Sequence, residues 1–405
     1  MTLWAGRAGG ELAGDVWEFL RGDDAELLPY DCAATLIHAR RLHAAGILDD
    51  DELCAVDASL AEVEPPGPED EDVHSAIERQ LGDVGRKIHA GRSRNDQVAA
   101  ALRLYVRDAC QEAHDAIRGF CSVILDRAEA EAETPLPGYT HLQRAIAVTL
   151  GHHLLAWVEM LERDLGRFTA ADEAATPSPL GAGALAGSTL PLPPPDGAQM
   201  RNSLDAVADR DFALDYLYAC TVLFTHLSRI GEELVLWATN EFGFVKLPES
   251  AATGSSMMPQ KLNPDVAELV RGKAGTMIGR LTGLLAVVKG LPLAYDRDLQ
   301  EDKQPVFGAR RDVRLALAAL TVLVEELRVN RSRLAEASAD PLLRATDMAE
   351  DLVRDGMPFR DAHEHVAAEV RAETFEPLEG SATRHAPGPE DVAGAAAAAR
   401  ARLAV

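Results

Sequence analysis

Apolar residues recur every three or four positions over most of the middle of the chain, with polar residues between them. One such series consists of Leu102, Val106, Ala109, Ala113 and Ile117. This spacing places the apolar side chains on one face of a helix. We therefore expect the middle of the chain to be helical almost throughout, without a strand-rich segment.

The same pattern predicts where the helices lie. Further long helices are expected at about residues 204–239, 262–289 and 308–336. Long helices joined by short turns run antiparallel, which favours an up-and-down bundle. The expected fold is all-α with three regions: an N-terminal helical domain at residues 1–98, a central long-helix bundle at 99–338, and a small C-terminal domain of two or three helices at 339–405.

Charge and composition limit the classes of function. The chain has 405 residues, a net charge of −25 and 47% hydrophobic residues, which is ample for a large core. Nucleic acid is not an expected partner, because phosphate binding requires clustered Lys and Arg. A small anionic substrate would need a local cationic pocket on a chain of this charge.

The chain also lacks the patterns of membrane segments and metal sites. No run of about 18 apolar residues could span a bilayer, and Met1–Gly10 has no apolar signal-peptide core, so we expect a cytoplasmic protein. The five cysteines are scattered, and His152 and His153 are adjacent rather than one helical turn apart. We expect neither a metal nor a cofactor.

The most distinctive stretch is Thr253–Asp265, with the sequence TGSSMMPQKLNPD. Gly254 and two serines favour a mobile or tightly turned backbone, and two prolines interrupt it. Asp265 and Glu268 then suit the positive first turn of a following helix. An isolated Gly-Ser-Ser is usually a polar connection between helices, whereas this longer string can present a hydroxyl beside a cation.

Two stretches before the long helices carry candidate binding groups. They are Asp70–Glu78 (DEDVHSAIE), which contains Asp72 and His74, and Ala90–Gln97 (AGRSRNDQ). Basic residues spaced around a glycine predict an anion-binding loop. The alternative for Arg92 and Arg94 is solvation at the surface.

A fourth stretch, Pro137–Ala145 (PGYTHLQRA), is interpreted as a Pro-Gly turn leading into a helix. His141 would then lie near the start of that helix. A histidine in such a place is often only a structural hydrogen-bonding group. It can also transfer protons near neutral pH, so both interpretations stay open.

Taken together, these strings resemble signatures of the fumarase/aspartase superfamily. The serine loop resembles the superfamily's signature loop, and Gly91–Val98 (GRSRNDQV) resembles the argininosuccinate lyase family more narrowly. Gly138–Arg144 (GYTHLQR) and Leu293–Lys303 (LAYDRDLQEDK) are similar to the same family. The resemblance extends over nearly the whole chain.

The resemblance implies roles for individual residues. The implied catalytic residues are Ser255, His141, Lys261 and Glu268. The implied substrate-binding residues are Asp72, His74, Arg94, Asn95, Thr140, Asn263, Tyr295, Gln300 and Lys303. In that family the serine removes a proton beside a carboxylate, and the histidine pairs with the glutamate and assists proton transfer. The arginine holds the succinate carboxylates.

The implied activity is elimination of fumarate from argininosuccinate to give L-arginine, by a homotetramer with active sites shared between subunits. The order of the long helices along the chain agrees with active sites shared between subunits. Arg94 precedes the first long helix and Ser255 precedes the fourth, so an up-and-down bundle would put them at opposite ends of one subunit. A second, antiparallel subunit would complete the site.

Three departures from the family pattern leave alternatives open. The family's serine near Phe19 and Leu20 is missing, Ala90 occupies the place of a threonine, and Asp296 occupies that of an asparagine. One alternative is a sister lyase that releases fumarate from another N-succinyl amine, as ethylenediamine disuccinate lyase does. The other is a non-catalytic structural homologue, although Ser255, Lys261 and His141 are all present.

Overall fold

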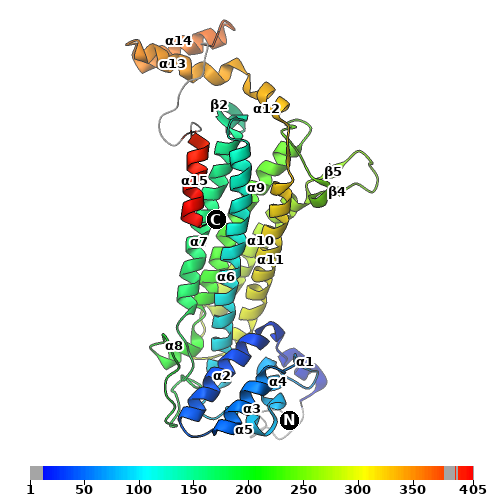
Figure 1. The fold of residues 1–405 in the computed structure, drawn as a ribbon, viewed down its shortest axis with the longest axis vertical. Helices are drawn as coiled ribbons and strands as arrows, with labels where there is room; N and C mark the ends of the chain where they lie inside the picture. Colours follow the sequence, from blue (N-terminus) through cyan, green and yellow to red (C-terminus); the bar gives the residue numbers. More distant parts are fainter. Residues whose placement is uncertain (1–11, 378–387, 389–390, 405) are drawn as a thin grey trace. The chain divides into compact units, whose positions relative to one another are not determined.

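The computed structural model describes residues 12–377, 388 and 391–404. Long helices dominate it (Figure 1). They are α6 (Arg94–Ala130), α7 (Leu150–Ala175), α9 (Asp211–Ala238), α10 (Asp265–Val288) and α11 (Lys303–Glu325). All five apolar side chains of the series from Leu102 to Ile117 are buried, so the predicted helical face is confirmed. No helix among the described residues is both long and apolar enough to cross a membrane.

The described residues form two compact units. Unit 1 consists of residues up to His114, Leu165–Val222 and Gly275–Arg314. Unit 2 consists of Asp115–Asp164, Leu223–Ala274 and the chain from Leu315 onward. Each long helix contributes residues to both units. The three sequence regions are a different division and stay a prediction.

Unit 1 contains the short helices of the N-terminal region. These are α1 (Gly14–Leu20), α2 (Leu28–Ala44), α3 (Asp50–Leu60), α4 (Val73–Gln80), α5 (Gly82–Ile88) and, later in the chain, α8 (Ser203–Ala208). The start of α4 is fixed by a capping box, in which the Asp72 carboxylate accepts from the Ser75 N–H and the Ser75 hydroxyl accepts from the Asp72 N–H. This cap places His74 in the first turn of α4.

The stretch after Pro135 corrects the sequence analysis. Strands β1 (Pro135–Thr140) and β2 (Gln143–Thr149) pair as an antiparallel hairpin, and helix α7 begins only at Leu150. The predicted Pro-Gly turn into a helix is therefore wrong. Two prolines cannot donate helical hydrogen bonds, and the β-branched residues of β2 favour strand. The Thr149 hydroxyl then accepts from the His152 N–H at the start of α7.

His141 and Leu142 form the tip of this hairpin instead of a helix start. Their φ angles are +55° and +56°, the left-handed conformation that a two-residue hairpin turn requires. Such angles are uncommon for residues other than glycine and recur at functional sites. Gly138 permits the bulge in β1, because a Cβ there would lie 2.6 Å from the Ile146 carbonyl oxygen.

Two predicted long helices are interrupted. The expected helix at 204–239 divides into α8 and α9, because Asp209 is extended and its carboxylate caps the new helix through the Asp211 N–H. The expected helix at 308–336 ends at Glu325. It is followed by strand β6 (Arg328–Val329), which pairs with β3 (Val245–Lys246), and by α12 (Arg331–Ser338).

The C-terminal region contains three α-helices among its described residues, as predicted. They are α13 (Ala345–Arg354), α14 (Phe359–Arg371) and α15 (Val392–Leu403). Ala349 on α13 packs with Ala362 and Val366 on α14, and Figure 1 shows these two helices side by side. Helix α15 is held to α7 by Arg402, which pairs with Glu162 at 2.7 Å.

Candidate active site

A cavity of about 170 Å³ in unit 1 gathers most of the predicted substrate-binding residues. Seven of them line it: Asp72, His74, Arg94, Asn95, Tyr295, Gln300 and Lys303. They come from three places in the chain, namely the start of α4, the start of α6 and the segment that leads into α11. Leu20, Gly22, Asp24, Glu71, Val98 and Arg297 complete the lining.

The start of α6 is anchored by the side chain of Asp96. One carboxylate oxygen accepts from the Ser93 N–H at 2.9 Å, and the other accepts from the N–H groups of Gly181 and Gly183 at 3.1 and 3.0 Å. The carboxylate thus caps α6 and ties it to the glycine-rich segment that follows α7. Arg94 and Asn95 lie directly beside this anchor.

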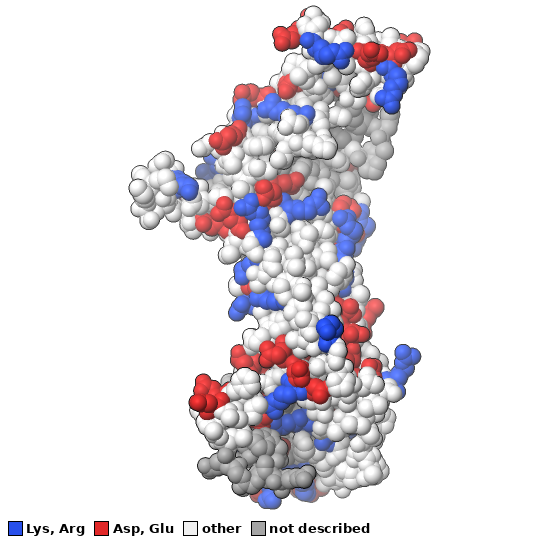
Figure 2. All heavy atoms as spheres, turned by 180° about the vertical axis from the view of Figure 1, so that it is seen from behind, with Lys and Arg blue, Asp and Glu red and all other residues white. Residues whose placement is uncertain are grey.

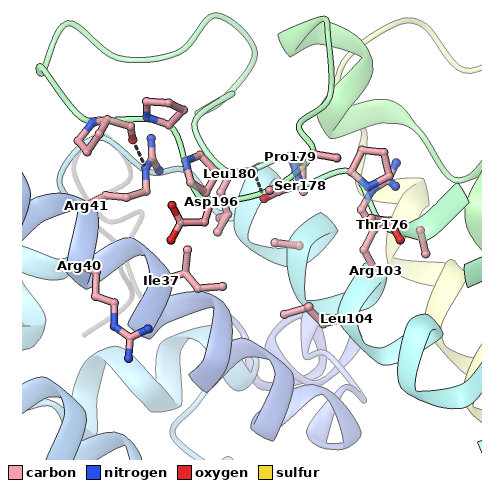
Figure 3. Close-up of a pocket in the computed structure, with 18 of the residues that line it drawn as sticks. Ile37, Arg40, Arg41, Arg103, Leu104, Thr176, Ser178, Pro179, Leu180 and Asp196 are labelled. Atoms are coloured by element: carbon pink, nitrogen blue, oxygen red, sulfur yellow. Dashed lines mark hydrogen bonds between the residues drawn. The ribbon is translucent and has the colours of Figure 1, made fainter. Parts of the chain in front are cut away.

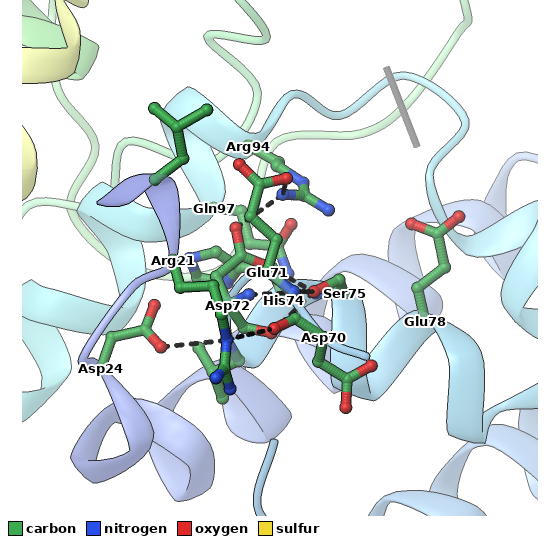
Figure 4. A network of polar contacts seen from close by, with 12 residues as sticks. Arg21, Asp24, Asp70, Glu71, Asp72, His74, Ser75, Glu78, Arg94 and Gln97 are labelled. Carbon is green, nitrogen blue, oxygen red and sulfur yellow. Dashed lines mark hydrogen bonds and ion pairs between the residues drawn. The ribbon is translucent and has the colours of Figure 1, made fainter. Parts of the chain in front are cut away.

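Arg94 meets acidic side chains in the cavity. Its Nη1 lies 2.6 Å from Asp72 Oδ2 and 3.6 Å from Glu71 Oε2 (Figure 4). Arg297 also pairs with Glu71, at 3.0 Å. The cavity therefore carries both signs of charge, so it can receive a ligand that is itself both anionic and cationic.

His74 is the most deeply buried cation-forming group at the cavity. Its Nδ1 lies 2.7 Å from Asp31 Oδ2, and Asp31 is fully buried. Gln97 donates to both oxygens of Asp31 at 2.9 Å, which fixes the carboxylate. Within the described structure, His74 Nε2 is buried and has no hydrogen-bond partner. It is available to a ligand in the cavity.

The charge of His74 follows from its partner. Burial disfavours the imidazolium, but the Asp31 carboxylate outweighs burial, so the pKa of His74 is raised above its usual value. Burial alone would likewise raise the pKa of Asp31, but His74 holds it below the usual range. Asp31 and His74 thus form a buried ion pair whose cationic member lines the cavity.

Lys303 is a second buried cation. Its Nζ lies 2.6 Å from Asp302 Oδ1, and Arg210 binds the other oxygen of the same carboxylate. Asp302 is fully buried, and its two cations outweigh burial and lower its pKa. One carboxylate shared by two cations leaves positive charge at this side of the cavity.

Several residues of this site were not predicted from the sequence. Asp31 and Gln97 orient His74, Asp24 accepts from the Val73 N–H at 3.0 Å, and Arg297 pairs with Glu71. Asp31 lies in the first turn of α2, where acidic residues are common, so its position in the sequence was not a distinctive signal. Arg92 also differs from a solvated surface arginine, because it is buried and donates to Thr35 at 2.9 Å.

Ser255 lies in unit 2, in the loop between the paired strands β4 (Thr253–Gly254) and β5 (Leu262–Asn263). Its Oγ accepts from the N–H groups of Met257 and Met258 at 3.3 and 3.0 Å. Two N–H donors at one hydroxyl oxygen stabilise negative charge there, which a serine base requires. As predicted, Asp265 and Glu268 lie in the first turn of the helix that follows.

Residues 255–261 of the serine loop, between β4 and β5, are largely solvent-exposed, and Lys261 is their one charged residue. Figure 2 shows this part of the loop as an almost uncharged surface with one basic side chain. Met257 is 88% exposed although it is apolar.

The remaining predicted residues also belong to unit 2. Thr140 and His141 are exposed at the hairpin tip, and Asn263 ends β5. Glu268 lies 3.8 Å from Arg271 on the same helix. Among the described contacts none joins His141 to Glu268, so that pairing stays a prediction. The structure thus divides the predicted residues into a unit 1 group and a unit 2 group.

Comparison with known proteins identifies the family. A lyase family model matches residues 67–279, and a model of the argininosuccinate lyase C-terminal region matches residues 342–380. An argininosuccinate lyase from Frankia casuarinae is 52% identical over 387 residues, covering 90% of this chain and 83% of the relative. The chain belongs to the argininosuccinate lyase family. A Synechococcus argininosuccinate lyase is 47% identical, over 91% of this chain and 80% of that relative.

Solved structures agree on the fold. The crystal structure of EDDS lyase with formate has a TM-score of 0.80 at 26% identity, over 98% of this chain and 91% of that chain. A 3-carboxy-cis,cis-muconate lactonizing enzyme from Pseudomonas putida has a TM-score of 0.76 at 20% identity, over 97% of both chains. The expected superfamily fold is confirmed.

Proposed function

We propose that this protein is a carbon–nitrogen lyase that eliminates fumarate from argininosuccinate and releases L-arginine, as a step of arginine biosynthesis. The observation that carries the proposal is the mixed charge of the unit 1 cavity. Argininosuccinate has three carboxylates and a cationic guanidinium. Arg94, Lys303 and the imidazolium of His74 suit the carboxylates, while Asp24 and Asp72 suit the cation.

The chemistry begins at the carbon beside a succinate carboxylate. Ser255 removes the proton there, and the electron pair moves into that carboxylate, which then carries two negative charges. Lys261 and Asn263 from the serine loop stabilise this intermediate, together with Arg94. The two N–H groups that donate hydrogen bonds to Ser255 Oγ make the serine a stronger acid and so favour its alkoxide.

The second step breaks the carbon–nitrogen bond. The electron pair returns from the carboxylate to form the carbon–carbon double bond of fumarate. The nitrogen leaves with the electron pair of the broken carbon–nitrogen bond. His141, paired with Glu268, supplies the proton to the leaving nitrogen. Thr140, Tyr295 and Gln300 position the substrate, and Asn95 holds its amino-acid end.

We further propose that the active enzyme is a cytoplasmic homotetramer whose sites combine unit 1 of one chain with unit 2 of another. The part of α10 in unit 1 supports this assembly. Its exposed residues are Gly275, Thr276, Ile278, Gly279, Thr282, Gly283, Leu285 and Ala286, and none is charged. An uncharged helix face rich in glycine suits close packing against a second copy of the chain.

A sister reaction on another N-succinyl amine is the second candidate. It is favoured by the segment around Leu20, which lines the cavity and lacks the serine that the family has near this position. Incubation with argininosuccinate and a panel of N-succinyl amines, followed by fumarate absorbance, separates the two. We expect argininosuccinate to give the highest kcat/KM. Preference for a different amine would support the sister reaction. If no substrate releases fumarate, the result would support a non-catalytic homologue.

The buried ion pair predicts a shift in pH dependence. Because its pKa is raised, His74 remains an imidazolium at pH values where an ordinary histidine has begun to lose its proton, and this charge is lost as pH rises through the raised pKa. Asp31→Asn removes the carboxylate that raises the pKa of His74. The imidazolium is then lost at lower pH, so the rise of KM with pH should begin at lower pH. Near neutral pH, KM should increase roughly tenfold, the expected loss for one charged hydrogen bond.

Gln97→Leu is the matched control for Asp31→Asn, because it loosens the same carboxylate without removing its charge. We expect this control to lower the melting temperature but to leave the midpoint of the KM profile in place. A midpoint that is the same in Asp31→Asn and in the wild type would show that His74 does not act as a cation toward substrate.

Chelation should leave the activity unchanged. No group of three or more His, Cys, Asp or Glu side chains in the described part of the chain is arranged to hold a metal ion. The proposed steps use a serine, cations and a histidine. Activity that disappears in a chelator and returns with one divalent ion would contradict this mechanism.

A further inference from the structure

Unit 1 contains a second cavity, of about 450 Å³, that none of the proposed catalytic steps uses. It lies between α2, the first turns of α6, and the segment that follows α7 (Figure 3). Its volume is within the usual range for small-molecule sites. The substrate cavity described above is smaller and has a different set of lining residues.

The walls of this second cavity combine apolar surface with arginines. Ile37, Leu104 and Leu180 contribute aliphatic side chains, and prolines at 177, 179 and 193–195 add rigid apolar surface. The charged residues on the walls are Arg40, Arg41, Arg103, Arg107 and Asp196. Arginines outnumber acids here although the whole chain has a net charge of −25.

Two of the four arginines are neutralised within the protein. Arg103 pairs with Asp209, and Arg107 Nε lies 2.9 Å from Asp172 Oδ1. Arg41, in contrast, donates to the neutral Pro193 carbonyl at 2.7 Å, and in the described structure Asp96 acts on its charge without forming an ion pair with it. Arg40 is exposed, and no hydrogen bond or ion pair involves it in the described structure.

The wall of this cavity is connected to the substrate-binding motif. Pro179 and Leu180 line it, and the next residues, Gly181 and Gly183, donate to the Asp96 carboxylate that caps α6. Further along the same segment, Ala184 accepts from the Asn95 amide at 3.1 Å. A ligand that holds Pro179 and Leu180 would therefore restrain the backbone that positions Arg94 and Asn95.

We propose that this cavity binds a small organic anion with one negatively charged head group and an apolar body, and that the bound anion steadies the start of α6. The head group pairs with Arg40 and Arg41, while the body covers Ile37, Leu104 and Leu180. The proposal is independent of the lyase reaction. Argininosuccinate does not fit the description, because its charges are distributed over its whole length.

Anilinonaphthalene sulfonate is a suitable probe, since it has one sulfonate and an aromatic body and becomes fluorescent in apolar sites. We expect saturable binding to the wild type with a Kd on the order of 10 μM. Thr176→Trp fills the cavity from an exposed wall position, and Arg40→Glu reverses the unpaired charge. Each should weaken binding at least about tenfold, a change of about 1.4 kcal/mol.

Arg86→Glu is the matched control, because Arg86 is an exposed arginine of unit 1 that does not line the cavity. It should bind the probe as the wild type does. Circular dichroism of each variant verifies folding. Absence of saturable binding to the wild type, or equal affinity in all four proteins, would overturn the proposed site.

Hydrogen exchange tests the connection to α6 without using activity. In the wild type, the probe should slow exchange of the amides at 95–100 and 181–187, and Thr176→Trp should show no such change. Saturable binding with unchanged exchange in both segments would refute the steadying of α6. Because neither readout requires turnover, failure of this proposal is distinguishable from failure of the proposed lyase function.

Discussion

Replacing Ser255 by alanine should lower kcat by at least about a thousandfold, the range expected when a positioned proton-transfer group is lost. The hydroxyl is the proposed base, and alanine has no group that could accept the proton beside the two N–H donors. The melting temperature should stay within about 2 °C of the wild type, because a loop side chain outside the core contributes little to stability. The comparison requires kinetics and calorimetry on the same preparations.

Ser256→Ala is the control for this experiment. Ser256 is the adjacent residue in the same loop, and it is exposed. Its replacement should change kcat only a few-fold, a cost of about 1 kcal/mol or less in transition-state stabilisation. Similar losses in both variants, or a loss of only a few-fold in Ser255→Ala, would remove Ser255 as the base.

Two inactive variants should restore each other's activity when they share tetramers. Arg94→Ala damages the cavity of unit 1, and Ser255→Ala damages the loop of unit 2. If each site takes one unit from each of two chains, random reassembly gives up to roughly a quarter of sites with both residues intact. The measurement is kcat after the two proteins are unfolded together and refolded.

The matched control mixes Arg94→Ala with Gln300→Ala. Both residues line the same cavity in the same unit, so every mixed site keeps one defect. This pair should recover nothing. Mixed tetramers of Arg94→Ala and Ser255→Ala, confirmed by mass, that stay inactive would contradict a shared site, and so would an active monomer.

Much of the helical architecture was predictable because long amphipathic helices repeat one simple spacing. The hairpin at β1 and β2 was not. Its strands are short, and its turn depends on left-handed angles at His141 and Leu142, residues that rarely adopt them. The break at Asp209 was also missed, because it depends on a single extended residue, whose carboxylate accepts from the Asp211 N–H at the start of the second helix.

The site was predictable where residues adjoin in sequence and obscure where they meet only in space. Arg94, Asn95 and Lys303 were found from contiguous strings, and the structure brings them to one cavity. Asp31 was missed because its purpose is visible only when α2 places it 2.7 Å from His74 on α4. The raised pKa of His74 depends on this contact with Asp31, so it is likewise a property of the folded chain.

The most direct test of the proposed function is to follow argininosuccinate by proton NMR in the presence of the wild-type enzyme. Fumarate and arginine should appear in equal amounts, and both should be absent with Ser255→Ala. Argininosuccinate that stays intact while another N-succinyl amine releases fumarate would rule out the proposed reaction.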